Sequence, residues 1–388
     1  MTQGLCPHAE ICGGCTYQGV PYAQQLERKN EEVLNYLLQS KLLCGEYTGS
    51  KPSPHIYAYR NKMEYSFGDE VKEGPMTLGL HRKKSYMSVI ETDGCQIVPP
   101  DFDLIRRSVL TAMRASGHSF HHKRTHKGFL RFLVLRRGEN TGQLLINLVT
   151  TDEETLDAEA FVNLLLSLET ENRIVGILHT IYNGRADVVA SDEMRLLYGV
   201  PYYEEKMMNR HFRVNALSFF QTNTAAVERM FTEALEMIPV LEEKKVFDLY
   251  CGTGAISLAL SGKAKEVIGI EIVAASVHAA KENATRNNVS NCRFLEGDAF
   301  EVLEGMNEHP DLIVVDPPRM GMHPKALKKI IGYRVDEILY ISCNPKTFAQ
   351  NAAVLTENGY RLDVLKVYDN FPFTKHIELS SRFILRER

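Results

Sequence analysis

The sequence predicts an α/β protein in which residues 216–388 form a doubly wound, mostly parallel sheet, and residues 1–215 form a preceding α+β unit. Two observations support this division. After residue 215, buried strand-like segments alternate with helix-like segments, which is the pattern of strands joined by crossover helices. Before residue 215, short segments of alternating apolar and polar residues are separated by glycine or polar turns, which predicts a largely antiparallel sheet.

The elements of the first unit follow from these patterns in chain order. Residues 22–43 carry charges on one side and Leu and Val on the other, which predicts a helix that packs on the C-terminal unit. A second helix is predicted over residues 156–169. The predicted strands of this unit are MEYSFGDE, MTLGLHRK, YMSVIETDGC, FLRFLVLRR, QLLINLVT and VGILHTIYNG.

In the second unit, a helix opens after FFQTN (219–223) and runs to about residue 239. The strand-like and helix-like segments that follow alternate in the order of a doubly wound sheet. They are KKVFDLY, AISLALS, EVIGIEI, SVHAAKENATRNN, CRFLEGD, DLIVVDPP, ALKKII, EILYISC, TFAQNAAVLTENG, RLDVLKVYD and RFILRE.

Composition excludes several classes of protein. The 388 residues carry a net charge of −4, so a nucleic-acid partner would need local basic patches. No apolar run approaches the ~18–20 residues of a membrane span, and the N-terminus lacks the hydrophobic core of a secretory signal. Eight cysteines are too sparse for a disulfide scaffold. We expect a cytoplasmic monomer with reduced thiols and no membrane partner.

The segment FDLYCGTGAISLAL (247–260) predicts a buried strand, a glycine turn and a helix. Gly252 and Gly254 would let the backbone approach a ligand at the helix N-terminus. Glu271 ends a second strand, where it can accept both ribose hydroxyls of a nucleoside, and Asp298 ends a third, near an adenine edge. Because the turn lacks the G-x-G-x-x-G spacing that binds pyrophosphate, the expected cofactor is S-adenosylmethionine. A cofactor-free α/β domain is the alternative.

Two further strand ends carry chemistry. Asp316 ends the strand of VVDPPR, and Cys343 ends the strand of YISCNP, so both should face the same crevice as the glycine turn. A buried core cysteine is the common alternative, but the position of Cys343 at the polar end of its strand favours a reactive thiol. Glu378 in HIELSSRF is a solvated strand residue unless it reaches that crevice.

CPHAEICGGC, near the start of the chain, has metal-ligand spacing in Cys6, Cys12 and Cys15. One ligand is missing. Cys95 is the best candidate because it lies in a predicted turn, and Cys44, at the end of a helix, is the second. Four cysteines fit either a 4Fe-4S cluster or structural zinc. Zinc sites more often pair two short C-x2-C knuckles, so the pattern favours iron–sulfur.

Taken together, FFQTN, DLYCGTG, GIE, DPPR, SCNP and FPFTKHIE resemble the motifs of the RNA uracil-5-methyltransferases of the RumA/TrmA type. The N-terminal cysteines add a seventh point, since ribosomal-RNA members carry an iron–sulfur cluster there. The resemblance implies a Rossmann-like, S-adenosylmethionine-dependent methyltransferase domain, with Cys343 as nucleophile and Glu378 as base. The implied cofactor contacts are Gln221, Tyr250, Glu271, Asp298 and Asp316.

By this resemblance, the enzyme methylates C5 of a uridine in 23S rRNA through a covalent Cys343–C6 adduct, and Glu378 removes the C5 proton. The cysteine cluster favours 23S rRNA over the alternative, a tRNA uridine, because bacterial tRNA members generally lack it. Arg319 in DPPR and the thiol in SCNP disfavour amino-group methylation. Intact Cys343 and Glu378 disfavour an inactive RNA-binding scaffold. The short leader before Cys6 predicts that the small N-terminal TRAM barrel of some relatives is absent.

An RNA substrate requires basic surface, and a stacked uracil must be flipped out or lie in a single-stranded loop. The segments 59–62, 81–84 and 121–137 are basic, and Phe129 and Phe132 are interleaved in the last one. These segments favour an RNA-contact surface, with an ordinary solvated face as the alternative. The loop NFPF would stack on the extruded base, or else serve packing.

Overall fold

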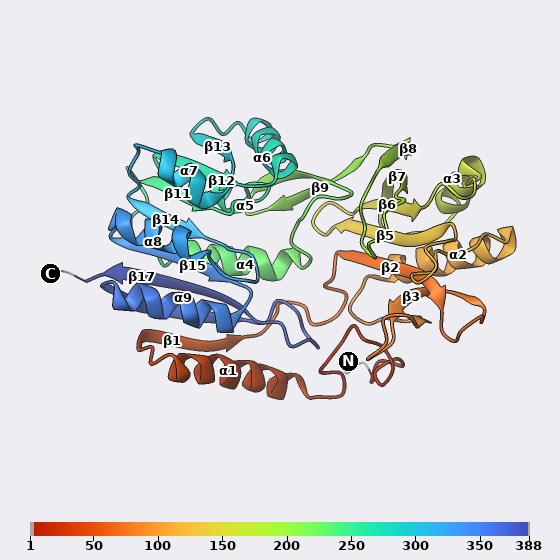
Figure 1. The fold of residues 1–388 in the computed structure, drawn as a ribbon, viewed down its shortest axis with the longest axis horizontal. Coiled ribbons are helices and arrows are strands. Elements are labelled where there is room, and N and C mark those ends of the chain that lie inside the picture. The colour runs from red at the N-terminus through yellow and green to blue at the C-terminus, as the bar shows by residue number, and fades with distance from the viewer. Residues whose placement is uncertain (1–3, 387–388) are drawn as a thin grey trace.

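The computed structural model describes residues 4–386. Two lobes lie side by side, each built on its own sheet (Figure 1). The larger sheet has eight strands, and the smaller has seven. In spatial order, the strands of the larger sheet are β1 (Cys44–Lys51), β16 (Tyr360–Tyr368), β17 (Glu378–Leu385), β15 (Glu337–Ser342), β14 (Leu312–Val315), β11 (Lys245–Leu249), β12 (Glu266–Glu271) and β13 (Cys292–Glu296).

Five neighbouring strands of this sheet, from β13 to β15, are parallel, and β17 runs antiparallel to both of its neighbours. Strand order reverses between β11 and β14, which makes their carboxyl ends the place where such sheets bind ligands. Both faces are buried: Val246 of β11 packs into one core cluster and Phe247 into another. This explains why these strands are continuous apolar runs.

Helices cover both faces of the larger sheet, as the alternating sequence pattern predicts (Figure 1). Parallel neighbours need such crossovers because a tight turn cannot join them. The helices of this lobe are α1 (Tyr22–Gln39), α4 (Thr224–Leu235), α5 (Ala255–Leu260), α6 (Ala274–Arg286), α7 (Ala299–Gly305), α8 (Pro324–Tyr333) and α9 (Pro345–Glu357).

The N-terminal segment departs from the division drawn at residue 215. Helix α1 packs against α9, and β1 pairs in parallel with β16 at the edge of the larger sheet. Residues 22–51 therefore lie with the C-terminal lobe. The sequence CGEYTGSK of β1 carries no apolar run, because an edge strand is only half covered, so no strand was predicted there.

The seven-stranded sheet is antiparallel except between β6 and β7, in agreement with the sequence pattern. Helices α2 (Pro100–Ser116) and α3 (Ala158–Leu166) pack on it, and α2 was not among the predicted elements. The strands in spatial order are β4 (Val89–Glu91), β3 (Met76–His81), β2 (Lys62–Asp69), β5 (Leu130–Gly138), β6 (Gln143–Thr150), β7 (Arg173–Ile181) and β8 (Glu193–Gly199).

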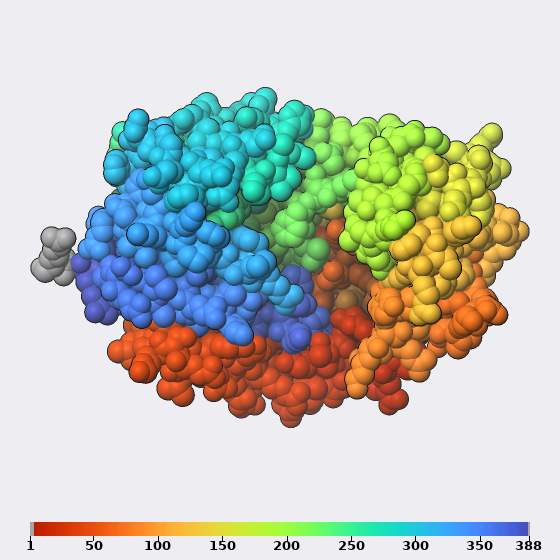
Figure 2. All heavy atoms as spheres, in the orientation of Figure 1, coloured from red at the N-terminus to blue at the C-terminus, as the bar shows by residue number. Residues whose placement is uncertain are grey.

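A hairpin of β9 (Tyr202–Met207) and β10 (Arg210–Asn215) joins the lobes. Its Tyr203 and Phe212 belong to one apolar cluster with Leu145 of β6 and with residues of the larger sheet, so a continuous core links the lobes. Figure 2 shows that the surface is hollowed between them. Within residues 4–386, no helix combines the length and the hydropathy that a membrane span requires.

Candidate active site and cysteine pocket

A cleft enclosing about 1680 Å³ of space open to solvent lies at the carboxyl ends of the parallel strands. The FFQT segment before α4, the turn after β11 and the ends of β12, β14 and β15 line it. Seven of the nine residues predicted for catalysis and cofactor binding line this cleft, whereas Gly254 and Asp298 do not. The seven are Gln221, Tyr250, Gly252, Glu271, Asp316, Cys343 and Glu378.

The glycine turn after β11 is left-handed at Tyr250 (φ 65°), Gly252 (φ 53°) and Gly254 (φ 84°). A Cβ at Gly252 would meet no atom within 4 Å, so this residue presents bare backbone to the cleft. Glu271 Oε2 accepts a hydrogen bond from Gly252 N at 3.1 Å and ties the turn to β12. Gly254 instead serves the turn itself, since a Cβ there would lie 3.2 Å from the Phe294 ring.

Asp298 acts as a helix cap in this structure. Its Oδ1 accepts hydrogen bonds from Phe300 N at 2.9 Å and Glu301 N at 3.4 Å, at the start of α7. Burial, together with the Asp298 carboxylate, raises the pKa of Tyr250 to about 12. Because Tyr250 lines the cleft, this effect places Asp298 near it. Asp298 therefore borders the end of the cleft that Tyr250 lines.

The pairing of β15 with β17 brings Cys343 to Glu378. Ser342 of β15 pairs with Leu379 of β17, so the next position on each strand is Cys343 and Glu378. The two side chains, 35 positions apart in the sequence, thus face the same cleft from adjacent strands. The antiparallel register of β17 decides this neighbourhood.

Protonated forms of both groups are favoured. Burial, followed by the Glu378 and Asp316 carboxylates, raises the pKa of Cys343 to about 11, and Arg319 opposes this shift. Burial and Asp316 raise the pKa of Glu378 to about 8, and Arg319 and Lys29 oppose that shift. Burial raises the pKa of Asp316 itself to about 7. Crowded carboxyl groups beside a thiol are typical of a site for proton transfer.

Arg319, used in the sequence only to disfavour another chemistry, lines the cleft between these groups. Its Nη2 lies 2.9 Å from His376 Nδ1, and its carbonyl oxygen accepts from Asn344 Nδ2 at 2.9 Å. The SCNP motif therefore positions DPPR as well as the thiol. Arg319 lies three residues after Asp316, at the end of DPPR, and this position is the sequence signal that could have assigned it to the site.

Aromatic residues at the cleft divide between exposed and packed. Phe219 lines the cleft with 70% of its surface exposed, and the sequence reasoning did not single it out. Of the loop NFPF, Phe373 is buried in the core of the smaller lobe, and Phe371 packs against that core and also lines the cleft. Both phenylalanines thus serve packing, and stacking of Phe371 on an extruded base stays a prediction.

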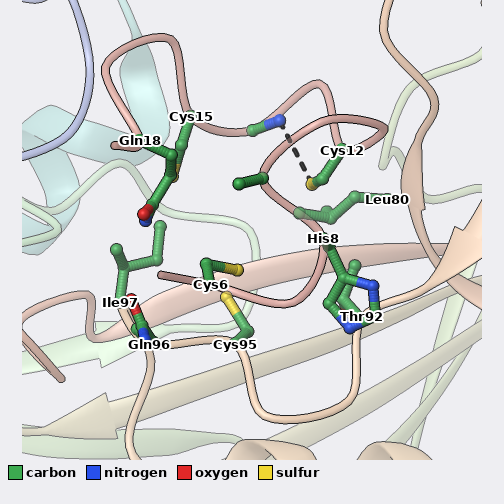
Figure 3. Close-up of a pocket in the computed structure, with 12 residues that line it drawn as sticks. Cys6, His8, Cys12, Cys15, Gln18, Leu80, Thr92, Cys95, Gln96 and Ile97 are labelled. Atoms are coloured by element: carbon green, nitrogen blue, oxygen red, sulfur yellow. Dashed lines mark hydrogen bonds between the residues drawn. The ribbon is translucent and has the colours of Figure 1, made fainter. Parts of the chain in front are cut away.

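A second pocket gathers the cysteines (Figure 3). Cys6, Cys12, Cys15 and Cys95 all line it, together with His8 and other residues. Burial and the neighbouring thiols raise the pKa of Cys15 to about 12, and burial with Cys6 and Cys12 raises that of Cys95 to about 11. No cluster of three or more His, Cys, Asp or Glu side chains in the described part of the chain is close enough to hold a metal ion as it stands.

Cys44, the second candidate for the fourth ligand, lies elsewhere. It begins β1 in the larger lobe, and its thiol donates to Glu46 O at 2.9 Å. All eight cysteines are free thiols. Cys95, rather than Cys44, therefore lies beside the N-terminal loop, as its turn-like sequence predicted.

One expectation for RNA contact is wrong. Phe129 and Phe132, taken as aromatics interleaved on a basic surface, are 0% and 6% exposed. Arg131 and Arg136 are buried beside them, where Arg131 donates to the carbonyl oxygens of Tyr182, Gly184 and Ala186. Residues 130–137 of the segment lie in β5, a central strand of the smaller sheet, and burial of this strand on both faces explains Phe132, whereas residues 124–127 before the strand are exposed.

Comparisons with known proteins agree with this geometry. The family described as tRNA (Uracil-5-)-methyltransferase matches residues 193–386. A Clostridium acetobutylicum protein named an uncharacterized RNA methyltransferase is 44% identical over 376 residues, which are 97% of this chain and 82% of that protein. The chain belongs to the RNA uracil-5-methyltransferase family. Membership makes it an S-adenosylmethionine-dependent enzyme of the RumA/TrmA type.

Other members of the family give the same result. A similarly named protein of Caldanaerobacter subterraneus is 41% identical over 374 residues, covering 96% of this chain and 83% of its own. The crystal structure of Pyrococcus abyssi tRNA (uracil-54, C5)-methyltransferase in complex with S-adenosyl-L-homocysteine superimposes with a TM-score of 0.80 at 25% identity, over 96% of this chain and 85% of that one. The α/β methyltransferase fold with mixed sheets is therefore that of the family.

Proposed function

We propose that this enzyme transfers a methyl group from S-adenosylmethionine to C5 of a specific uridine in 23S rRNA. The observation that carries the proposal is the register of β15 and β17, which sets the Cys343 thiol next to the Glu378 carboxyl in one cleft. A thiol and a carboxyl in this arrangement are what methylation at a ring carbon requires, and methylation of an amino group requires neither.

Uracil C5 is a poor nucleophile, and the thiol corrects this. Cys343, whose thiol proton is lost to solvent at the open cleft, adds to C6 as a thiolate, forming an Sγ–C6 bond and moving the C5–C6 electron pair into an enolate with carbanion character at C5. After C5 has gained its methyl group, Glu378 takes the C5 proton. The C5–H electron pair re-forms the ring double bond, and the Sγ–C6 electron pair returns to Cys343.

The methyl donor would lie along the strand ends. Gly252 offers bare backbone, Glu271 a carboxylate for the ribose hydroxyls, and Gln221 and Tyr250 further polar and aromatic lining. Asp298 would border the adenine end from its position at the start of α7. When bound, the donor supplies an electrophilic methyl group on a sulfonium. Removal of water by substrate and donor would leave Arg319 as the cation that favours the Cys343 thiolate.

A 4Fe-4S cluster would be held by Cys6, Cys12, Cys15 and Cys95, the four cysteines that line the second pocket. Four thiols line one pocket, and burial together with neighbouring thiols raises the pKa of Cys12, Cys15 and Cys95, so their thiolates would coexist there only around a cation. No step of the methyl transfer needs an electron, so the cluster would serve structure or RNA positioning.

A transfer-RNA uridine is the second candidate target, because the solved Pyrococcus abyssi relative acts on uracil-54 of tRNA. Mapping of 5-methyluridine by mass spectrometry in ribosomal and transfer RNA from a strain that lacks the gene decides between the two. Loss of one 5-methyluridine from 23S rRNA is the expected result. Loss from tRNA alone would replace 23S rRNA as the substrate, and unchanged RNA of both kinds would contradict the function.

A further inference from the structure

One face of α1 is unusual for a helix that packs on a core. Its buried residues are Gln25, Lys29, Val33 and Leu37, spaced four apart so that they form a single stripe. Val33 and Leu37 join the apolar core, as such a stripe normally does. Gln25 and Lys29, toward the helix N-terminus, are 0% exposed. A buried ammonium is strongly unfavourable unless it is paired, so its partners indicate what it does.

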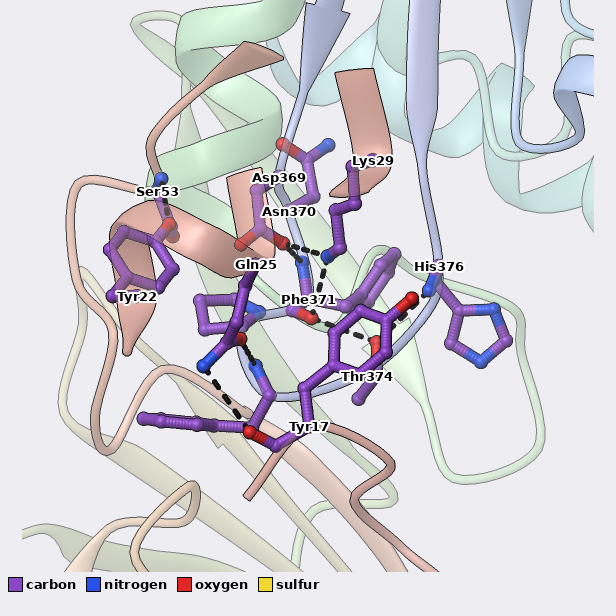
Figure 4. Close-up of polar contacts among 12 residues, drawn as sticks. Tyr17, Tyr22, Gln25, Lys29, Ser53, Asp369, Asn370, Phe371, Thr374 and His376 are labelled. Atoms are coloured by element: carbon purple, nitrogen blue, oxygen red, sulfur yellow. Dashed lines mark hydrogen bonds and ion pairs between the residues drawn. The ribbon is translucent and has the colours of Figure 1, made fainter. Parts of the chain in front are cut away.

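Lys29 holds the backbone of Phe371 (Figure 4). Its Nζ lies 2.6 Å from Asp369 Oδ1 and 3.4 Å from the carbonyl oxygen of Phe371. The same Asp369 Oδ1 accepts from Phe371 N at 3.1 Å. The ion pair thus binds both the N–H and the C=O of the residue whose ring lines the cleft.

The neighbouring part of the same loop is held in a strained conformation. Phe373 has φ 65°, in the left-handed region that a bulky residue rarely adopts. Its N–H donates to Gln25 Oε1 at 2.9 Å, and its carbonyl oxygen accepts from Thr16 N and Tyr17 N at 2.9 and 2.8 Å. Strain of this kind persists only where surrounding contacts enforce it, and such places cluster at functional sites.

A chain of hydrogen bonds leads from Lys29 toward Glu378. The carbonyl oxygen of Phe371 also accepts from Thr374 Oγ1 at 2.8 Å, and Thr374 Oγ1 in turn accepts from His376 N at 3.2 Å. Glu378 follows two residues later, as the first residue of β17. The loop 369–376 therefore sets where β17 begins and how its first side chain enters the cleft.

We propose that Lys29, through its buried ion pair with Asp369, is a positioning residue that fixes loop 369–376 and so places the Phe371 ring and the Glu378 carboxyl for removal of the uracil C5 proton. The inference rests on the proposed function. It concerns the step after methyl transfer, in which the C5 proton passes to Glu378, the ring double bond re-forms and the Sγ–C6 bond breaks toward Cys343. When the loop loosens, that step slows and the covalent adduct persists.

The positive charge of Lys29 also favours the base form of Glu378, in addition to the contacts by which Lys29 positions the loop. The charged groups that act on Glu378 are Asp316 after β14, Arg319 in the following loop and Lys29 on α1, with the Cys343 thiol beside it. Lys29 is one of the two cations that lower the pKa of Glu378 against burial and Asp316. Removing its charge therefore favours the protonated carboxyl, which cannot accept a proton.

The test uses the Lys29→Met variant and in vitro transcribed 23S rRNA, with tRNA transcripts run in parallel. We expect the covalent RNA–protein adduct on denaturing gels to rise several-fold, and 5-methyluridine release to fall by about 10- to 100-fold, the scale of a mispositioned catalytic group. The KM for S-adenosylmethionine should stay within about twofold. The pH at half-maximal release should move upward from that of the unmodified enzyme. Normal release with an unchanged pH profile would overturn the proposal.

A double variant distinguishes loss of positioning from misfolding of the protein. Lys29→Met leaves the Asp369 carboxylate buried and unpaired, whereas Lys29→Met with Asp369→Asn removes both charges and keeps an acceptor for Phe371 N. We expect this double variant to unfold near the normal temperature and still accumulate adduct. Release at the normal rate in a folded double variant would refute the role of Lys29, and so would full activity of Lys29→Met alone.

Two controls separate this inference from the proposed function. Lys244→Met removes a 2.5 Å pair with Glu337 at the opposite end of β15, and release should be unaffected. If Lys244→Met slows release as much as Lys29→Met does, loss of any ion pair in this lobe is enough to slow release, and the specific role of Lys29 is overturned. Glu378→Gln should trap adduct. If it does not, the base assignment fails; if it does while Lys29→Met releases product normally, only the present inference fails.

Discussion

In the cleft, the residues proposed for chemistry stand at the ends of hydrogen-bonded strands, whereas in the cysteine pocket all four thiols stand outside helices and strands. The ladder of β15 and β17 holds Cys343 next to Glu378 through backbone pairing. The loop of Cys12 is held by single hydrogen bonds rather than by a strand ladder, such as Gly13 N to His81 O at 2.9 Å and Lys83 N to Ile11 O at 2.8 Å.

The two sites therefore differ in how far their geometry depends on a bound ligand. Backbone pairing forms the cleft whether or not anything is bound, so its variants should lose chemistry and keep stability. If the pocket holds the proposed cluster, its local order depends on that cluster, and variants of its cysteines should lose the cluster and local order first. The two sites meet in one loop, because Phe373 O accepts from Thr16 and Tyr17, directly after Cys15.

The largest effect is expected at the cleft, from Cys343→Ala. Without the thiol, C5 gains no carbanion character, and methylation should fall by at least about 10⁴-fold. The measurement is 5-methyluridine formed under single-turnover conditions, with binding of S-adenosylmethionine by calorimetry as the control. RNA that contains 5-fluorouridine should give a covalent adduct with the unmodified enzyme and none with the variant. Adduct in normal yield from Cys343→Ala would contradict the nucleophile.

Glu378→Gln should lower turnover by about 10²- to 10⁴-fold, the usual contribution of a general base. Here methyl transfer precedes the failing step, so methylated RNA should remain attached to the protein. The ratio of attached to released 5-methyluridine, measured after denaturation, distinguishes this variant from Cys343→Ala. Free product at the normal rate would contradict the base.

A smaller effect on catalysis, and a larger one on the bound metal, is expected from Cys95→Ser. Protein purified without oxygen should be brown with about four irons per chain, as four-thiolate ligation of such a cluster requires. The variant should hold iron more weakly and unfold at a lower temperature, while S-adenosylmethionine binding persists. Cys44→Ser, in the other lobe, is the matched control and should keep its iron. If the purified protein is colourless and contains one zinc ion per chain, the site is a zinc site and the cluster assignment is wrong.

The smallest effect is a pH dependence. Burial raises the pKa of Glu378 to about 8 and that of Cys343 to about 11, so both groups are more protonated near neutrality than exposed side chains of their kind. Methylation needs the Cys343 thiolate, so its single-turnover rate should rise with pH toward about 11, whereas release of methylated RNA, which needs ionised Glu378, should rise from about pH 7 to about pH 9. A rate that falls over this range would show that a protonated group limits the reaction instead.

Local sequence was enough to predict those parts of the molecule that depend on a single strand or a single turn. Gly252 and Glu271 were predicted at a ligand-binding edge because a strand, a glycine turn and an acidic strand end are contiguous signals. The buried strand β5 shows where such reasoning fails. Its Arg131 and Phe132 suggested a basic aromatic surface, but carbonyl oxygens of the loop after β7 satisfy the arginine, and that contact has no sequence signature.

By itself, the sequence determined the doubly wound sheet, the motif residues along its edge and the set of cysteines, because periodicity and residue chemistry are properties of short segments. Only the tertiary structure decided that β1 extends the larger sheet, that Cys343 neighbours Glu378 and that Lys29 lies buried against Asp369. Lys29 and Asp369 are 340 positions apart, and a charged residue on an amphipathic helix is otherwise expected to face solvent. Pairings of this kind depend on strand register and helix docking, which no local pattern encodes.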